Sequence, residues 1–309
     1  MDNTVNEMGA DPGHLTNDDP ALWEQAARLQ LVAQSVVDQQ LAGIHLSPHR
    51  GQSIEFSEHR HYQPGDDPRK IDWRAFGKTN KLHVKEYENE TRMQVHLALD
   101  HSGSMGFPSE SDKMSKFGWS KQLFAVLAYM FIKQGDAVSC SAFNNRTTDY
   151  LESSSVPSHL GRVLRALTGV SATGPSDFGN VIHEGNREKR RPTLNFFISD
   201  FFSPMYVANL NFPTIPVNQG RMVAIQVLSP QEIQFAFQQP TSFKSLEGPD
   251  ELFLFPMQIR KTYLKKLRAY NNALERHFHK SGAYFFRFPT QHDLASAVTE
   301  MVSVIQTML

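Results

Sequence analysis

The sequence has a single cysteine, Cys140, among 309 residues, and it contains no run of about 18 apolar residues that would cross a membrane. One cysteine excludes an internal disulfide framework and cysteine-rich zinc sites. Neither sign of charge dominates, because 31 Lys and Arg residues stand against 32 Asp and Glu residues. A dedicated nucleic-acid-binding protein usually carries a basic surplus, so we expect no nucleic-acid partner.

The beginning of the chain also lacks the features of a secretory signal. Residues 1–19 are polar and acidic, rich in Asp, Asn, Gly and Pro, without a basic start or an apolar stretch. We expect these residues to form a disordered tail. Together with the missing membrane span, this composition predicts a cytoplasmic protein without membrane insertion.

Residues 20–92 are predicted to form an N-terminal helix and an irregular extension. Apolar residues recur at helical spacing from Pro20 to about Ala42, and Gly43 is a plausible stop signal. The following stretch is rich in His, Arg, Lys and Asp, with scattered aromatic residues and turns at Pro64 and Pro68. Residues 82–87 suggest a short strand in this extension.

Residues 93–309 alternate between strand and helix patterns. This alternation predicts one α/β domain with a mostly parallel sheet and helices on both faces. The expected strands are residues 93–100, 136–143, 193–199, 222–228 and 283–288, with short strands and turns in 230–255, and the expected helices are residues 114–134, 156–167, 178–188, 257–280 and 292–308.

Oxygen-bearing side chains follow the ends of the predicted strands. Asp100, Ser102 and Ser104 come directly after one strand, and Asp200 follows another. The loop Thr173-Gly174-Pro175-Ser176-Asp177 precedes a predicted helix. Ligands of open α/β sheets gather beyond the carboxyl ends of the strands, so these three loops are candidates for one site.

Carboxylates combined with hydroxyls suit a hard divalent cation. Mg²⁺ and Mn²⁺ prefer such oxygen ligands, and Mg²⁺ usually keeps several waters, one of which a carboxylate of another protein could replace. Each loop taken alone is also compatible with a simple turn or helix N-cap. The occurrence of three such loops favours the metal site.

Two segments give the chain a family resemblance. The string YQPGDDPRKIDWRAF, followed by LHVKEYENE and VHLALDHSGSM, resembles the bacterial domain-of-unknown-function family 58 (DUF58). Asp100-x-Ser102-x-Ser104, with the Ser176 loop and Asp200, resembles the metal-ion-dependent adhesion site (MIDAS) of von Willebrand factor A domains. The resemblance implies a von Willebrand factor A-like, Rossmann-type fold and a partnership with a MoxR-type AAA+ ATPase that assembles or matures a client protein.

The same resemblance implies the members of the metal site. Ser102 and Ser104 would coordinate the cation directly, and Asp100 and Asp200 would act directly or through waters, with Mg²⁺, or else Mn²⁺ or Ca²⁺, as the ion. The family usually has Gly-Thr-Asp in the middle loop. This chain has Pro175, Ser176 and Asp177 there, which makes Ser176 and Asp177 the candidates and leaves Thr173 as an alternative ligand.

Phe201 also differs from the pattern of von Willebrand factor A domains, many of which have Gly directly after the last Asp of the site. Its bulk could reduce access to the cation.

We expect a binding module with no catalytic residues. A phosphoesterase that uses the same cation is the alternative, and it would need a general base such as Asp177 or His101. Otherwise His101 is expected to be a loop residue that faces solvent. The Gly-x-Ser-x-Gly, Gly-x-x-x-x-Gly-Lys and His-Glu-x-x-His motifs of common enzymes are absent from the sequence.

Overall fold

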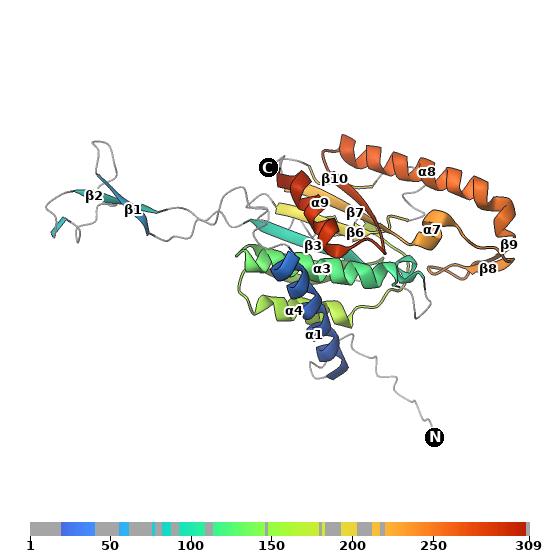
Figure 1. The fold of residues 1–309 in the computed structure, drawn as a ribbon, viewed down its shortest axis with the longest axis horizontal. Coiled ribbons are helices and arrows are strands. Elements are labelled where there is room, and N and C mark those ends of the chain that lie inside the picture. The colour runs from blue at the N-terminus through green and yellow to red at the C-terminus, as the bar shows by residue number, and fades with distance from the viewer. Residues whose placement is uncertain are drawn as a thin grey trace, which may run out of the picture.

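The computed structural model describes residues 20–40, 56–61, 76–77, 82–87, 93–108, 114–145, 148–178, 181–182, 193–202, 212–216 and 220–306 (Figure 1). The predicted N-terminal helix is present as α1, Pro20–Gln34, which continues as a π-helical turn over Ser35–Gln40. In the extension, β1 (Phe56–His61) and β2 (His83–Tyr87) pair in antiparallel fashion. The predicted tail 1–19 and most of the remaining extension lie outside the described residues.

The main domain is built on a six-stranded sheet. Five strands run parallel, and β5 lies antiparallel at one edge. The predicted α/β class and the five predicted parallel strands are therefore confirmed. The strands are β3 (Gln94–Asp100), β4 (Ala137–Phe143), β5 (Thr148–Ser154), β6 (Thr193–Ser199), β7 (Gly220–Leu228) and β10 (Tyr284–Pro289).

The order of the strands locates a natural binding position. The sheet reads β10-β7-β6-β3-β4-β5, so the first and fourth strands of the sheet, β3 and β6, are neighbours. This is the 3-2-1-4-5-6 order of doubly wound folds, in which the order of the strands reverses between strands 1 and 4, although the two strands are parallel. Asp100 ends β3 and Asp200 directly follows β6, so both carboxylates lie at this switch point.

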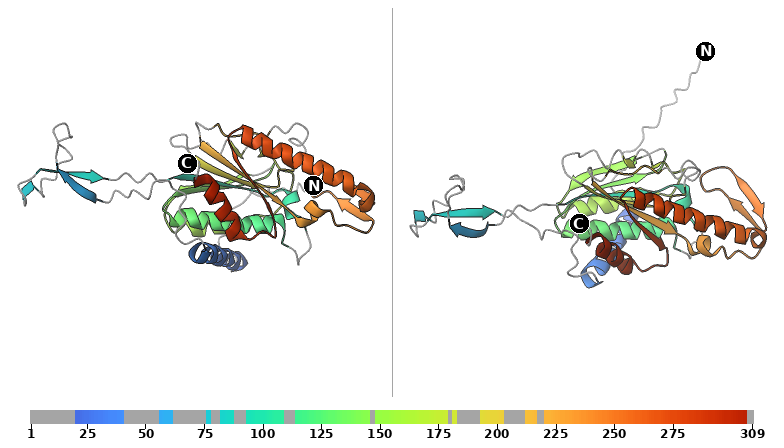
Figure 2. Two further views of the ribbon diagram at one scale, coloured as in Figure 1. Left: turned by 45° about the horizontal axis from the view of Figure 1, so that its top comes forward. Right: turned by 90° about the horizontal axis from the view of Figure 1, so that it is seen from above.

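Helices cover both faces of the sheet, as predicted (Figures 1 and 2). On one face, α1 packs with α3, α4 and α9 over the side chains of Val95, Leu97 and Leu99 in β3. On the other face, Ala98 contacts a second core that includes Leu274 and Phe278 of α8. Alternate residues of a strand point to opposite faces, so a buried parallel strand needs apolar residues in both sets. The helices are α3 (Lys116–Lys133), α4 (His159–Gly169), α8 (Pro256–Lys280) and α9 (Leu294–Gln306).

The segment between β7 and α8 forms a small appendage beside the site. A short helix, α7 (Pro230–Gln234), is followed by a two-stranded antiparallel hairpin of β8 (Thr241–Lys244) and β9 (Glu251–Leu254). The prediction of short strands and turns is correct apart from α7. In the predicted helix 178–188, Phe178, Val181 and Ile182 are helical, and the rest lies outside the described residues. Within the described part of the chain, no helix is long and apolar enough to cross a membrane.

Candidate metal site

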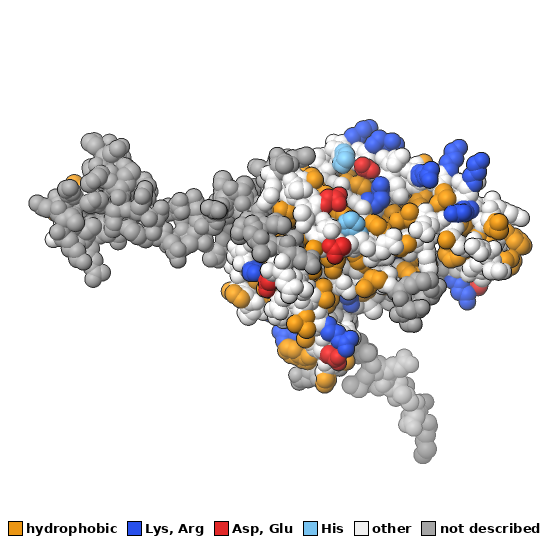
Figure 3. Space-filling view, viewed as in Figure 1, with side chains coloured by type: hydrophobic (Ala, Val, Ile, Leu, Met, Phe, Trp, Pro, Cys, Tyr) orange, Lys and Arg blue, Asp and Glu red, His pale blue; other side chains and the backbone are white. Residues whose placement is uncertain are grey.

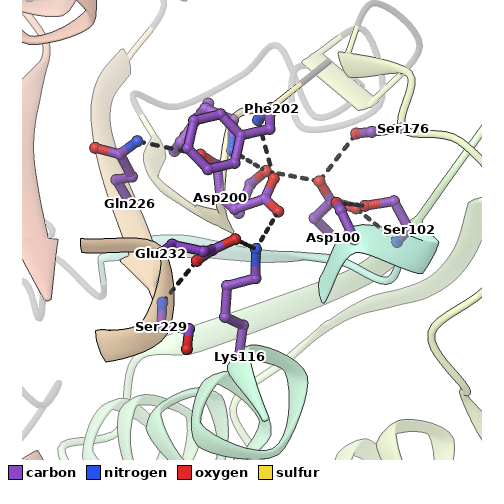
Figure 4. Close-up of polar contacts among 12 residues, drawn as sticks. Asp100, Ser102, Lys116, Ser176, Asp200, Phe202, Gln226, Ser229 and Glu232 are labelled. Atoms are coloured by element: carbon purple, nitrogen blue, oxygen red, sulfur yellow. Dashed lines mark hydrogen bonds and ion pairs between the residues drawn. The ribbon is translucent and has the colours of Figure 1, made fainter. Parts of the chain in front are cut away.

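Asp100 is held rigidly at the carboxyl end of β3. Its Oδ1 accepts a hydrogen bond of 2.8 Å from the Ser102 backbone N–H. Its Oδ2 accepts from the hydroxyls of Ser176, at 2.9 Å, and Ser199, at 2.6 Å. Asp100 is fully buried, and Figure 4 shows Ser102 and Ser176 converging on it. Side chains from two of the three predicted loops thus meet at this carboxylate.

The hydroxyls of Ser102 and Ser104 form a pair beside Asp100. Their Oγ atoms lie 3.2 Å apart, at the start of a 3₁₀ turn, Gly103–Gly106, that directs both side chains to one side. Two ligands in adjacent octahedral positions around Mg²⁺ lie about 2.9 Å apart, because Mg–O bonds are about 2.0–2.1 Å long. The pair therefore has nearly the spacing of two neighbouring ligands of one cation.

Asp200 has a partner that the sequence did not suggest. Nζ of Lys116 lies 2.7 Å from Oδ2 of Asp200 and 2.6 Å from Oε1 of Glu232. Lys116 is the first residue of α3 and is fully buried, and Figure 4 shows its side chain rising between the two carboxylates. The other oxygen of Asp200, Oδ1, accepts from the Phe202 backbone N–H at 2.9 Å. Asp200 thus forms an ion pair with Lys116, which it shares with Glu232.

The electrostatics of the site remain unbalanced. Burial and the charge of Asp200 raise the pKa of Asp100 to about 6, against the opposing hydrogen bonds from Ser199 and Ser102. Burial alone would lower the pKa of Lys116, but the charges of Asp200 and Glu232 raise it above its ordinary value. Burial also raises the pKa of Glu232, and Lys116 opposes this shift. The site therefore holds one ammonium, Lys116, and three carboxylates, Asp100, Asp200 and Glu232, which leaves a formal charge of -2 when all are ionised.

The middle loop contributes Ser176 by direct contact with Asp100. Thr173, the alternative ligand, is held through its backbone: its N–H donates to the His101 carbonyl, and its carbonyl accepts from the Asn144 side chain. The role of Asp177 as a ligand stays a prediction. The expectation that His101 faces solvent is wrong, because His101 is 5% exposed and its Nδ1 lies 3.1 Å from the Ser171 carbonyl oxygen.

Phe201 adopts a backbone conformation that normally favours glycine, with a φ of 59°. The ring is buried in an aromatic cluster, with centroids 5.1 Å from Phe178 and 5.2 Å from Phe278. A left-handed conformation costs a residue with a side chain about 1–2 kcal/mol, and burying a Phe ring contributes about 1.5–3 kcal/mol, which offsets that cost. The ring points into the core rather than over the site, so Phe201 does not block access as its bulk suggested.

The donor set fits a hard divalent cation. Asp100 and the Ser102–Ser104 pair offer oxygens, and the excess negative charge favours a cation at this position. Among the described residues, no group of three or more His, Cys, Asp or Glu side chains is arranged as a metal site. A cation here would therefore use hydroxyls and waters in addition to the Asp100 carboxylate.

An open hollow of about 490 Å³ adjoins the serine pair. Its lining includes Ser104, Phe202, Glu232, Glu247 and Tyr263, so it connects the candidate site with the β8–β9 hairpin and α8. This hollow gives a ligand access to the site from outside.

Sequence reasoning missed three charged residues of this region: Lys116, Glu232 and Glu247. A signal existed for Glu232, because Ser229 and Glu232 form a capping box at the start of α7, and the Glu232 carboxylate accepts from the Ser229 N–H. Lys116 heads a long apolar helix, where a lysine is expected to extend into solvent. Nothing in the local sequence points to Glu247.

Comparison with known proteins identifies relatives over most of the chain. The model of the family described as "Protein of unknown function DUF58" matches residues 58–272. The chain is 23% identical over 291 residues to the uncharacterized protein Rv1480 of Mycobacterium tuberculosis, which covers 93% of this chain and 90% of that protein. The uncharacterized protein Mb1516 of Mycobacterium bovis matches equally well.

Several solved structures are similar to this chain at low sequence identity. An aerotolerance-related membrane protein from Bacteroides fragilis is 12% identical, with a TM-score of 0.42, over 70% of this chain and 100% of that chain. The conserved hypothetical protein BatB from Bacteroides thetaiotaomicron is 12% identical, with a TM-score of 0.40, over 70% and 99%. The SpRpn10 VWA domain is 13% identical, with a TM-score of 0.39, over 68% and 95%.

Proposed function

The chain belongs to the family described as Protein of unknown function DUF58, and from this membership we propose that it is a protein-interaction module that binds a divalent cation at Asp100, Ser102 and Ser104. Mg²⁺ is the proposed ion, and Mn²⁺ and Ca²⁺ are the alternatives. Ser176 would orient Asp100 through its hydrogen bond. Asp200 and its ion-pair partner Lys116 would set the electrostatic potential at the cation position. Asp177 is a further candidate ligand from the resemblance.

The observation that carries this proposal is the serine pair next to a buried carboxylate with excess negative charge. The oxygens of Ser102 and Ser104 lie 3.2 Å apart, and the pKa of Asp100 is raised to about 6, largely by burial and then by Asp200. When bound, a cation would supply an electrophilic position for an acidic side chain of a partner. The protein's own residues would fix that position, and Lys116 would pair with Asp200.

Exposed apolar residues near the site support an interaction role. Leu252, Phe253, Phe255 and Met257 are 62%, 65%, 51% and 76% exposed, and they follow one another on the hairpin and the first turn of α8. Figure 3 shows hydrophobic side chains gathered at this end of the molecule. Contiguous exposed apolar residues commonly mark a surface that another protein covers.

The partner that we propose is a MoxR-type AAA+ ATPase, together with a client protein that the two assemble or mature. This choice comes from the family resemblance of the sequence. Phosphoester hydrolysis receives less support, because the candidate base His101 is buried and its Nδ1 faces the Ser171 carbonyl oxygen. We therefore propose binding rather than catalysis.

Isothermal titration calorimetry with MgCl₂ and MnCl₂ tests the cation. We expect saturable binding to the wild-type chain and loss of at least tenfold in affinity in Asp100→Asn, because a charged oxygen ligand is removed. Asp293→Asn, a change of the same charge at the exposed start of α9, is the matched control and should bind as the wild type does. Identical titrations of wild type and Asp100→Asn would remove the cation from the proposal.

Co-purification tests the partner. A tagged chain should retain the ATPase in buffer with Mg²⁺ and release it with EDTA, and Asp100→Asn should fail to retain it in either buffer. If the amount of retained ATPase changes neither with EDTA nor with Asp100→Asn, the interaction does not depend on the cation.

A further inference from the structure

The tip of the β8–β9 hairpin rests directly on the serine loop. Residues 245–250 form this tip, which is closed by a hydrogen bond of 2.7 Å from the Ser245 N–H to the Asp250 carbonyl. A Cβ atom placed on Gly103 would lie 2.0 Å from the carbonyl oxygen of Leu246. The backbone of the tip therefore lies against the backbone between Ser102 and Ser104, at a distance that only glycine permits.

Glu247 projects from this tip into the hollow beside Ser104. Its Oε1 is buried and has no hydrogen-bond partner. Burial raises the pKa of Glu247, while the hydroxyl and backbone N–H of Ser104 oppose the shift, and the charges of Asp200 and Lys116 also act on it. Glu247 therefore brings a carboxylate to Ser104, one of the proposed ligands of the cation.

A buried carboxylate oxygen without a partner is unfavourable, since it loses its water and gains no hydrogen bond. A divalent cation between the hairpin tip and the serine loop would give Oε1 of Glu247 the positively charged partner that it lacks. The same cation would be coordinated by the Oγ atoms of Ser102 and Ser104.

We propose that Glu247 is the chain's own acidic ligand at this site, and that the β8–β9 hairpin is a removable cap that occupies the position of a partner's acidic side chain. The proposal rests on the proposed function and adds a regulation of the same site. A partner must present a carboxylate and displace Glu247 to reach the cation.

The surface around the hairpin fits such a partner. Helix α8 carries seven Lys and Arg residues and one Glu, whereas the whole chain has a net charge of -1. Figure 3 shows Lys and Arg side chains along α8, next to the apolar residues of the hairpin. An acidic segment with apolar side chains is complementary to this face in both respects. Contacts of this partner segment with Phe253 and Phe255 would displace the hairpin, and with it the tip that carries Glu247.

The test compares the wild type with Glu247→Gln, and Glu251→Gln in β9 of the same hairpin is the matched control. Mn²⁺ alone is the first probe, and water proton relaxation reports how many waters the bound ion retains. We expect Mn²⁺ bound to Glu247→Gln to gain about one water and to bind about tenfold more weakly than in the wild type. Glu251→Gln should match the wild type in both respects.

Two further readouts address the cap and the competing carboxylate. Hydrogen exchange of residues 245–250 should be about tenfold faster in Glu247→Gln than in the wild type when Mn²⁺ is present. Acetate, used as a small carboxylate probe, should displace water from Mn²⁺ bound to Glu247→Gln and have no effect on the wild type. Glu247→Asp, which keeps the charge on a shorter side chain, should lie between the two.

The outcomes separate this inference from the function on which it rests. If the wild type binds no Mn²⁺, or if Asp100→Asn binds Mn²⁺ as tightly as the wild type does, the proposed cation site is wrong. If the wild type binds Mn²⁺ through Asp100 but Glu247→Gln retains the same waters, the same affinity and the same hairpin exchange, the cap is overturned and the cation site stands.

Discussion

Lys116 is a fully buried ammonium between two carboxylates, so replacing this one residue should have a large effect on the free energy of unfolding. We predict that Lys116→Met lowers the free energy of unfolding by about 3–5 kcal/mol, because it leaves Asp200 and Glu232 buried without a counter-charge. Urea denaturation measures this loss. Adding Asp200→Asn and Glu232→Gln to the variant should recover part of the stability.

Lys133→Met serves as the control, since Lys133 pairs with Asp38 at the surface, and both side chains are about half exposed. An exposed pair contributes about 1 kcal/mol at most. Equal losses in Lys116→Met and Lys133→Met would contradict the role given to the buried pair.

His96 predicts a pH dependence of stability. It lies within β3 with its ring nitrogens 3.0 Å from the hydroxyls of Ser139 and Ser141, and burial lowers its pKa to about 4. The unfolded chain has a His pKa of about 6.5, so the unfolded state binds the proton first as the pH falls. The contribution of His96 is therefore complete above about pH 6.5 and is lost toward pH 4, at up to about 1.4 kcal/mol per pH unit.

Urea denaturation at pH 7.5, 5.5 and 4.5 checks this prediction. His96→Gln should be less stable than the wild type at pH 7.5, and the difference should shrink as the pH falls. A difference that stays constant over this range would show that His96 does not titrate as its burial requires.

The residues of the site divide into those with a local signal and those without one. Asp100, Ser102 and Ser104 could be predicted because their spacing after a strand is itself the motif, and Asp200 because it ends a second buried strand. Lys116 could not be predicted because a lysine at the start of a helix normally extends into solvent, and Glu247 could not because its hairpin is distant in sequence from the loops of the site. Phe201 is explained only by the aromatic cluster that holds it at positive φ.

At the scale of elements, the docking of the hairpin on the serine loop depends on Gly103. We predict that Gly103→Ala displaces the tip, because its Cβ would overlap the Leu246 carbonyl oxygen at 2.0 Å. Hydrogen exchange should rise in residues 245–250 and stay unchanged in β6 and β7. Gly161→Ala in α4, where a Cβ meets nothing within 4 Å, is the control. Unchanged exchange of the tip in Gly103→Ala would contradict the close packing of hairpin and loop.

The elements differ in how well the sequence predicts them. β3, β6 and β7 are buried on both faces, so their apolar runs stand out. β5 was missed because its sequence, TDYLESS, is mostly polar and lies at the sheet edge, where pairing with β4 rather than burial holds the strand. α7 was missed because five residues are too few to show a helical period.

The whole molecule brings the site together through its topology. Placing β3 beside β6 in the sheet sets two loops, separated by about a hundred residues of chain, at one switch point. The sequence predicts this meeting because buried strands alternate with helices in a regular way. The basic surface of α8 and the hairpin beyond the sheet could not be placed from the sequence alone.

Anomalous X-ray diffraction from crystals of the full chain grown with MnCl₂ tests the cation site most directly. The account predicts one strong anomalous peak within about 2.3 Å of the hydroxyl oxygens of Ser102 and Ser104, beside Asp100 and with Glu247 as a further ligand. Peaks confined to other positions, with the two serine hydroxyls bonded to each other, would contradict it.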